Sequence, residues 1–138
     1  MNKGKSIAIA LSLVAVLSGC SSEGKSASDS AQMNQTLSMK TDFKFMSDFL
    51  KAMKSNGVVC TGLTKRDEIM VKDAGDCDFN GQVLSLTLFS SQEAGNQIYS
   101  AMESLMSGYL LTSNNWWIQV DDESTAKILE DKLGVRVK

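Results

Sequence analysis

Residues 77–88 read CDFNGQVLSLTL, and this stretch decides the fold of the 138-residue chain. The Asn-Gly pair at 80–81 is a strong signal for the two-residue turn of a β-hairpin, because both turn positions need a positive φ. After the turn, leucine occupies every second position of residues 84–88, which predicts a strand with one buried face. In this hairpin Cys77 pairs with Leu84, so its thiol faces the core.

The segments before the turn extend the sheet. We expect one strand at 58–64, and the first strand of the hairpin lies within 68–79. A turn near residues 67–70 would set Cys60 opposite Cys77 on the buried side, where the two form a structural disulfide in an oxidising compartment. A redox-active pair is the alternative, but the Cys-x-x-Cys spacing typical of such pairs is missing.

Helical periodicity flanks the strands. Apolar side chains recur every three or four residues over 39–55, which predicts a helix that stops at Asn56-Gly57. A capping box, Ser90-Ser91-Gln92-Glu93, opens a second helix that ends at Gly108.

The C-terminal part closes the predicted fold. Residues 109–112 and 116–120 are expected to be extended around a turn at 113–115, and a last helix, capped by Asp121 or Asp122, stops at a glycine. The order α-β-β-β-α-β-α predicts an α+β two-layer sandwich, with the helices on one face of an antiparallel meander.

The N-terminus has the parts of a secretory signal: Lys3 and Lys5, a short apolar run at 7–17, and small residues before Cys20. The apolar run is too short to remain as a membrane-spanning helix. The residues Leu17-Ser18-Gly19-Cys20 resemble the bacterial lipobox. This resemblance implies cleavage before Cys20, diacylglycerol on its thiol, and anchorage to the outer face of the cell membrane, or to the outer membrane in a two-membrane cell. An ordinary signal peptide with a chance cysteine is the alternative.

Three parts of the chain follow from this interpretation. Residues 1–19 are the lipoprotein signal peptide, and residues 20–36 are the lipidated Cys20 with a flexible tether rich in Ser, Ala, Gly, Asn and Gln. Residues 37–138 form a single α+β domain, long enough for one modest core.

Composition excludes several functions. Histidine is missing, which removes Ser-His-Asp and Cys-His catalysis and histidine-ligated zinc. The balance of 14 basic and 16 acidic residues, without a basic patch, argues against nucleic-acid binding. With Cys20 in lipid, the two remaining cysteines are too few for a zinc or iron–sulfur site. We therefore expect no catalysis and no cofactor.

Residues 76–81 match the first half of an EF-hand calcium loop, which makes Asp76, Asp78 and Asn80 weak candidate metal ligands. The twelfth position of the loop is Thr87 instead of a bidentate glutamate. A hairpin turn with outward acids is the favoured interpretation.

Two further features are candidates for function. Trp116 and Trp117 would face opposite sides of a strand, so one core cannot hold both. We expect one of them in the core, and the other is either covered by the last helix or exposed as a contact point, which makes Trp116 and Trp117 candidate partner-binding residues. The acidic run Asp121, Asp122 and Glu123 is interpreted as helix capping, with a catalytic carboxylate pair as the alternative.

The folded part resembles small lipoproteins of Gram-positive, actinobacterium-like bacteria, a group without a settled activity. The residues that carry the resemblance are Gly57-Val58-Val59-Cys60, Cys77, Asn115-Trp116-Trp117-Ile118 and the closing helix from Ala126 to Leu133-Gly134. One departure is the single Gly134, where such proteins often have two glycines.

The function expected from the sequence is a lipid-anchored extracytoplasmic interaction module that binds or modulates an envelope protein without catalysis. A phage or plasmid exclusion or immunity lipoprotein is one alternative. A small-solute or calcium-binding lipoprotein is a second, and a hydrolase that uses carboxylates is a third.

Overall fold

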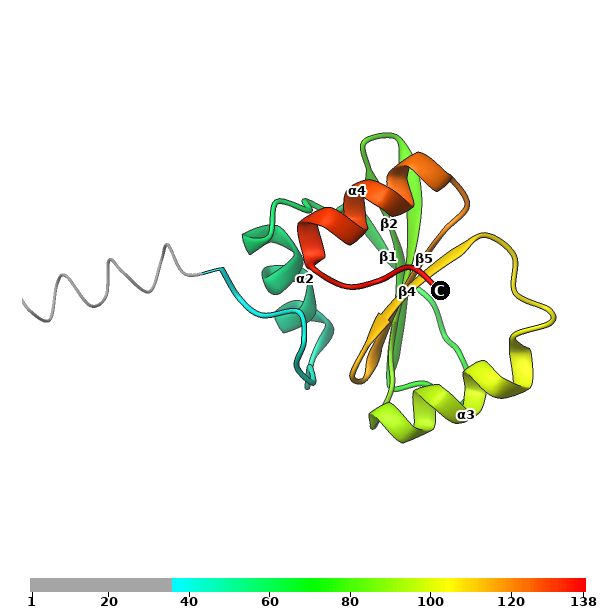
Figure 1. Cartoon of the computed structure of the whole chain (residues 1–138). Coiled ribbons are helices and arrows are strands. Elements are labelled where there is room, and N and C mark those ends of the chain that lie inside the picture. The colour runs from blue at the N-terminus through cyan, green and yellow to red at the C-terminus, as the bar shows by residue number, and fades with distance from the viewer. Residues whose placement is uncertain (1–35) are drawn as a thin grey trace, which may run out of the picture. The chain divides into compact units, whose positions relative to one another are not determined.

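The computed structural model describes residues 36–138, which form one compact unit. Its centre is a five-stranded antiparallel sheet in the order β1-β2-β3-β5-β4, accompanied by three helices (Figure 1). The elements are α2 (Met46–Ser55), β1 (Thr61–Lys65), β2 (Asp73–Phe79), β3 (Gln82–Leu88), α3 (Gln92–Met102), β4 (Tyr109–Ser113), β5 (Trp116–Val120) and α4 (Glu123–Leu133). The predicted α+β class is confirmed. The predicted signal and Cys20 lie outside the described residues, and no helix of residues 36–138 is long and apolar enough to cross a membrane.

The hairpin at the centre of the sequence forms as predicted. Asn80 and Gly81 have φ values of 55° and 82°, and Cys77 pairs with Leu84 in the antiparallel register of β2 and β3. The carboxylate of Asp78 accepts a hydrogen bond from the Gly81 N–H at 3.1 Å, which closes the turn.

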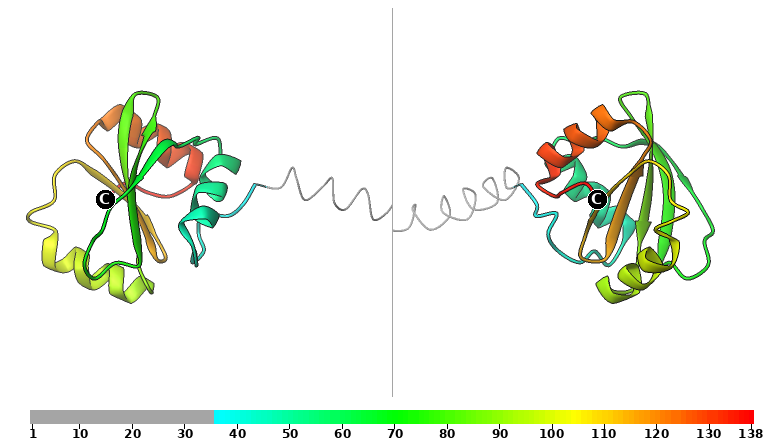
Figure 2. Two further views of the ribbon diagram at one scale, coloured as in Figure 1. Left: turned by 180° about the vertical axis from the view of Figure 1, so that it is seen from behind. Right: turned by 45° about the vertical axis from the view of Figure 1, so that its right-hand side comes forward.

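Both faces of the sheet are covered. The main core lies between one face of the sheet and the helices α2 and α4, whereas α3 packs through Ile98 and Tyr99 on a second cluster of Phe89, Leu110 and Trp117. Both views in Figure 2 show α3 apart from the other two helices. The prediction of helices on one face therefore needs a correction for α3. Alternate strand residues point to opposite sides, and β4 and β5 supply apolar residues to both, since Leu111 and Trp116 lie in the main core and Leu110 and Trp117 in the second cluster.

The first helix is shorter than predicted. It begins at Met46, and Phe45 before it has the extended backbone angles φ −133° and ψ 149°. Met39 and Phe43 are nevertheless buried in the main core. The backbones of Met39 and Phe43 bond to distant side chains in place of helical partners. The Trp116 indole N–H donates to the Met39 carbonyl at 2.9 Å, and the Phe43 N–H donates to Asn115 Oδ1 at 2.8 Å.

The second half shows two smaller differences. Ser91, one residue later than predicted, caps α3 by accepting from the Ala94 N–H at 3.1 Å. The extended stretch after α3 is a hairpin of two strands, and Asn114 at its turn has a φ of 47°. The last helix is capped by Asp122 and stopped by Gly134, as predicted.

The two edges of the sheet differ. Val137 forms an antiparallel bridge with Leu111, and the Lys138 N–H donates to the Leu110 carbonyl at 2.8 Å, so the C-terminal tail covers the free edge of β4. Every residue of β1 at the other edge is exposed.

Candidate functional site

A groove of about 540 Å³ lies on the face of the sheet that carries α3. Its floor is formed by β3 and β5, one wall by α3 and the segment after it, and the other wall by the loop 66–71. We call it the outer groove. The side chains that line it from the floor and the helical wall are Thr87, Phe89, Trp117, Gln119, Ile98, Met102 and Met106. The lining is mostly apolar and includes two flexible methionines, which adapt to the shape of what they contact.

The loop wall is fixed at its ends and exposed at its tip. The Arg66 N–H donates to the Ala74 carbonyl at 3.0 Å, and the Lys72 N–H to the Leu88 carbonyl at 2.8 Å. Between them Met70 takes a φ of 71°. Ile69 and Met70 are 93% and 77% exposed. Two large apolar side chains are therefore held in water beside an apolar groove.

The opposite wall continues this apolar surface. Met70 and Met102 line a second, smaller hollow together with Ala94, Ile98 and Ala101 of α3. Met102 is 45% exposed, and Leu105 just after the helix is 80% exposed. Neighbouring exposed apolar side chains of this kind are typical of a docking site.

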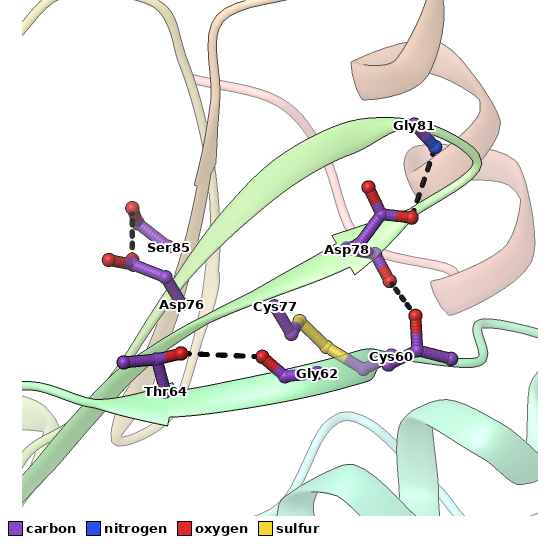
Figure 3. Close-up of a disulfide and its surroundings, with 9 residues drawn as sticks. Cys60, Gly62, Thr64, Asp76, Cys77, Asp78, Gly81 and Ser85 are labelled. Carbon is purple, nitrogen blue, oxygen red and sulfur yellow. Dashed lines mark hydrogen bonds between the residues drawn. A yellow bond between two sulfur atoms is a disulfide. The ribbon is translucent and has the colours of Figure 1, made fainter.

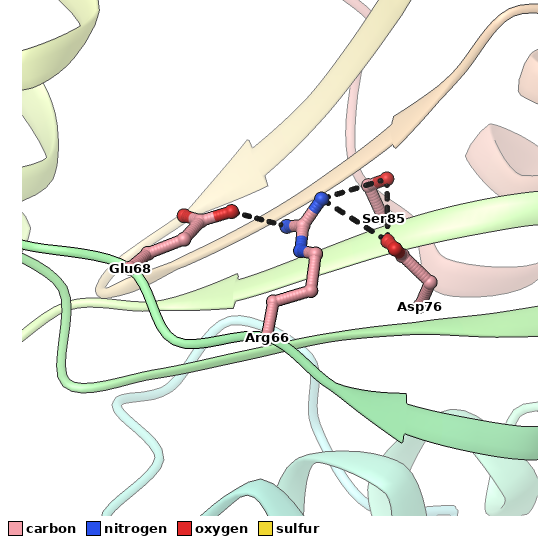
Figure 4. A network of polar contacts seen from close by, with 4 residues as sticks. All are labelled: Arg66, Glu68, Asp76 and Ser85. Atoms are coloured by element: carbon pink, nitrogen blue, oxygen red, sulfur yellow. Dashed lines mark hydrogen bonds and ion pairs between the residues drawn. The ribbon is translucent and has the colours of Figure 1, made fainter.

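A polar network holds the root of the loop (Figure 4). The Arg66 guanidinium lies 2.8 Å from the Glu68 carboxylate and 3.1 Å from that of Asp76, which also accepts a hydrogen bond from the Ser85 hydroxyl at 2.8 Å. These groups are about one third exposed, so each ion pair contributes little to stability. The Nε of Arg66 is buried without an acceptor among residues 36–138. The network gives one end of the outer groove a charged, hydrogen-bonding character.

The two tryptophans are both buried, on opposite faces of the sheet. Trp116 is fully buried in the main core, where its ring centroid lies 5.1 Å from that of Phe49. Trp117 is 9% exposed and packs against Phe89 and Tyr99, with centroids 4.5 Å and 6.2 Å away. Trp116 is therefore the tryptophan that was expected in the core, and its ring is not an exposed contact point. Trp117 contributes only to the floor of the outer groove, because the sheet has a core on each face.

The weak metal candidates have other partners. Asp76 belongs to the Arg66 network, Asp78 accepts from the hairpin turn, and Asn80 supplies the positive φ of that turn. Within residues 36–138 no three acidic, histidine or cysteine residues gather as a metal site would need. The half-motif is therefore interpreted as a hairpin turn.

Cys60 and Cys77 form the predicted disulfide, with their Cα atoms 5.5 Å apart (Figure 3). The register differs from a simple opposite pair, because Thr61 pairs with Asp78 and Thr64 with Asp76. The extra residue makes a bulge at Gly62, whose φ is 64°. The disulfide ties the exposed strand β1 to the middle of the sheet.

The acidic run after β5 acts at the start of α4. Hydrogen bonds from the Ser124 hydroxyl, and from the hydroxyl and N–H of Thr125, hold the pKa of Asp122 below its ordinary value. Lys127 lies 2.7 Å from the Glu123 carboxylate and likewise lowers the pKa of that group. A carboxylate acid and base would need pKa values shifted apart. Both shifts have the same direction, so helix capping is the better interpretation.

Sequence reasoning missed the outer groove. The signal that could have found it is the run Ile69-Met70-Val71 in a segment taken as a turn, since turns are usually polar. No known protein family, curated protein or solved structure matches this chain.

Proposed function

We propose that this protein is a lipid-anchored extracytoplasmic module that binds another protein of the cell envelope through the outer groove, without catalysis. The observation that carries the proposal is the exposure of Ile69 and Met70, at 93% and 77%, beside a groove with an apolar floor. A protein partner that covers these side chains removes their apolar surface from water, at roughly 25 cal/mol per Å².

The anchor in this proposal rests on the lipobox-like residues Leu17-Ser18-Gly19-Cys20. Diacylglycerol places two acyl chains in the bilayer, and two chains are enough for stable anchoring. The described part of the chain starts beside α2, where the Leu37 N–H donates to the Ser55 hydroxyl at 3.0 Å. This attachment is on the main-core side of the sheet, opposite to α3. The outer groove is thus on the side of the domain away from the attachment.

The groove suits an apolar side chain or a helix face of a partner protein. Ile98, Met102 and Met106 form one apolar wall, and Trp117 presents its ring at the floor. Partly buried aromatic and methionine side chains are enriched at the centres of protein interfaces. The Arg66 network at one end offers hydrogen bonds that can fix the orientation of the partner.

The test is crosslinking in living cells. A photo-crosslinking residue replaces Gln97, an exposed residue of α3 that lines the smaller hollow, and the captured proteins are identified by mass spectrometry. We expect one envelope protein to be enriched, and its capture to be lost when Ile69→Asp is introduced.

The matched control is Ile128→Asp, which places the same charge at a 42%-exposed isoleucine of α4. This variant should capture the same protein as the parent. Equal loss in both variants, or no enriched envelope protein, would argue against the proposal. Mass spectrometry of the mature N-terminus tests the lipid on Cys20 in the same preparation.

A small apolar solute is the second candidate, and the groove volume of about 540 Å³ favours it, since ligand pockets commonly measure about 300–1,000 Å³. Native mass spectrometry of protein purified from its own cells distinguishes the two. A bound small molecule that is lost in Ile69→Asp would support the solute in place of the protein partner.

A further inference from the structure

Charge is divided unevenly along the folded chain. Residues 36–72 carry seven basic and four acidic side chains, whereas residues 73–138 carry four basic and ten acidic ones. The basic residues of the first part are Lys40, Lys44, Lys51, Lys54, Lys65, Arg66 and Lys72. In an acidic protein this asymmetry indicates a local surface for an anionic partner.

Exposed apolar side chains share that surface. Phe45, Val59 and Leu63 are 55%, 50% and 38% exposed. Two shallow hollows hold them, and both hollows are lined by Ser47 and Leu50 of α2, so they are neighbours on one continuous surface. Lysines stand in the same hollows, and we call the combined surface the basic face. It consists of Phe45, Leu50, Val59 and Leu63 with Lys51, Lys54 and Lys65.

The positive charge of the basic face is only partly compensated. Asp73 lies in one hollow and is 3.9 Å from the Lys65 ammonium, a long contact at a position where Lys65 is 74% exposed. Lys51 and Lys54 on α2 are exposed and have no ion-pair partner among residues 36–138. Asp48 is the only acidic residue of α2.

Phe45 stands among cations. Its ring centroid lies 5.4 Å from the Lys44 ammonium and 6.0 Å from that of Lys72. An aromatic ring flanked by lysines matches the interfacial region of a bilayer, where the ring enters the acyl boundary and the ammonium groups meet phosphates.

The attachment of the rest of the chain is on the same side. Leu37 bonds to Ser55 and Asn56 at the end of α2, beside Lys54, and Figure 1 shows the cyan segment at the start of the described chain running beside this helix. Cys20 is sixteen residues before Thr36. A lipid on Cys20 would therefore keep the basic face within reach of the bilayer.

We propose that the basic face lies on the surface of an anionic lipid bilayer. This inference takes its setting from the lipid anchor of the proposed function, but the contact itself depends only on the described residues. Because α3 packs on the opposite side of the sheet from α2, this orientation turns the outer groove away from the bilayer, toward partners in the envelope.

The first experiment uses the mature chain with Cys20→Ala, so that no lipid contributes. Its sedimentation is measured with vesicles of phosphatidylcholine alone and of an equal mixture with phosphatidylglycerol. We expect binding to the mixed vesicles that weakens as salt is added. The variant Lys51→Gln/Lys54→Gln should bind about 25-fold more weakly, since one lysine near an anionic surface contributes about a factor of five.

The matched control compares single variants, Lys54→Gln on the basic face and Lys138→Gln in the tail, where Lys138 lies over Tyr99 on the α3 side. Lys54→Gln should weaken binding about fivefold, and Lys138→Gln should bind like the parent. Equal loss in the two single variants would overturn the proposal, because it would show that net charge alone matters. Failure of the parent to bind mixed vesicles would also overturn it.

A variant at Phe45 separates membrane contact from folding. Phe45 is the N-cap of α2 and makes no side-chain cap, so Phe45→Ser supplies the preferred capping hydroxyl while it deletes the ring. We expect weaker vesicle binding without a lower melting temperature. Unchanged binding would show that the ring does not enter the interface and would overturn its assigned role.

The second experiment uses the lipidated protein on the same vesicles and measures lysine acetylation by an amine reagent. Lys51 and Lys54 should be protected on mixed vesicles relative to neutral ones, and Lys138 on the α3 side should not. Equal labelling of all three would overturn the orientation. Capture of an envelope protein at Gln97 could still succeed in that case, so failure here is distinct from failure of the proposed function.

Discussion

The side-chain amide of Asn115 forms a two-way hydrogen-bonded bridge to the backbone of Phe43. Its Oδ1 accepts from the Phe43 N–H at 2.8 Å, and its Nδ2 donates to the Phe43 carbonyl at 2.9 Å and to the Phe89 carbonyl at 3.0 Å. Asn115 is 3% exposed. One buried side chain thus satisfies three backbone groups and fixes residues 39–45 on the sheet.

We predict that Asn115→Ala lowers the free energy of unfolding by about 3 kcal/mol, because each buried backbone group left without a partner costs roughly 1–3 kcal/mol. Urea denaturation at neutral pH measures the change. Asn96→Ala is the control, since Asn96 is exposed on α3 and alanine favours helices. A loss below about 1 kcal/mol at Asn115 would show that water replaces the bridge.

The disulfide gives a second prediction. Cys60 and Cys77 are 17 residues apart, and a loop of that size contributes about 3 kcal/mol in the chain-entropy account. Cys60→Ala/Cys77→Ala should lose about that much free energy of unfolding. Alanine is used in place of serine, because serine would bury a hydroxyl at position 77. A reducing agent should destabilise the parent to the same extent and leave the double variant unchanged. Equal stability with and without reductant in the parent would contradict the prediction.

Features of the fold that depend on residues close in the sequence were predicted correctly. The Asn80-Gly81 hairpin, the stop of α4 at Gly134 and the register that turns Cys77 inward depend on neighbouring residues, and all are confirmed. The predicted start of α2 was wrong, because the backbone before Met46 is held by a residue far away in the sequence. Asn115, 72 residues after Phe43, accepts a hydrogen bond from the Phe43 N–H. The spacing of apolar residues correctly indicated that Met39 and Phe43 are buried. It did not show whether the segment that carries them is a helix or an extended chain.

The site was harder to predict than the fold. The position of α3 creates the groove, and α3 packs there because β5 carries apolar residues on both faces. The sequence left open whether the second tryptophan is exposed or covered by the last helix, and it did not indicate that α3 covers it. Gly95 shows how close the packing is, since a Cβ there would lie 3.0 Å from the Phe89 ring. Ile69 at the tip of the loop becomes part of a groove only because α3 lies on the other side of that groove.

The different surroundings of Trp116 and Trp117 give a third prediction. Trp116→Phe should lower the free energy of unfolding by about 3 kcal/mol, because it leaves a cavity in the main core and removes the donor to the Met39 carbonyl. Trp117→Phe should cost about 1 kcal/mol, since a phenyl ring can keep the contact with Phe89.

Fluorescence quenching by acrylamide checks the same pair. The Trp116→Phe variant retains only Trp117, at the groove floor, and should be quenched more strongly than Trp117→Phe. The reverse order would contradict the assignment of the two rings. If the captured partner covers the outer groove, its addition should protect Trp117 from acrylamide.

The capping carboxylate of Asp122 gives a prediction on pH. Hydrogen bonds from Ser124 and Thr125 lower the pKa of Asp122 in the folded state below its ordinary value of 3.8, and the unfolded chain keeps that ordinary value. A carboxylate with a depressed folded-state pKa contributes stability above its unfolded pKa and loses it as pH falls through the folded one. The free energy of unfolding should therefore fall as the pH drops below 3.8. In Asp122→Asn, which keeps a capping oxygen but does not titrate, the fall should be shallower. Urea denaturation between about pH 2 and pH 6 measures both slopes.

Asp122→Ala should be less stable than the parent at neutral pH, because its cap is lost at every pH. Parallel curves for the parent and Asp122→Asn would show that the carboxylate does not couple folding to pH, and that the cap works through its geometry alone.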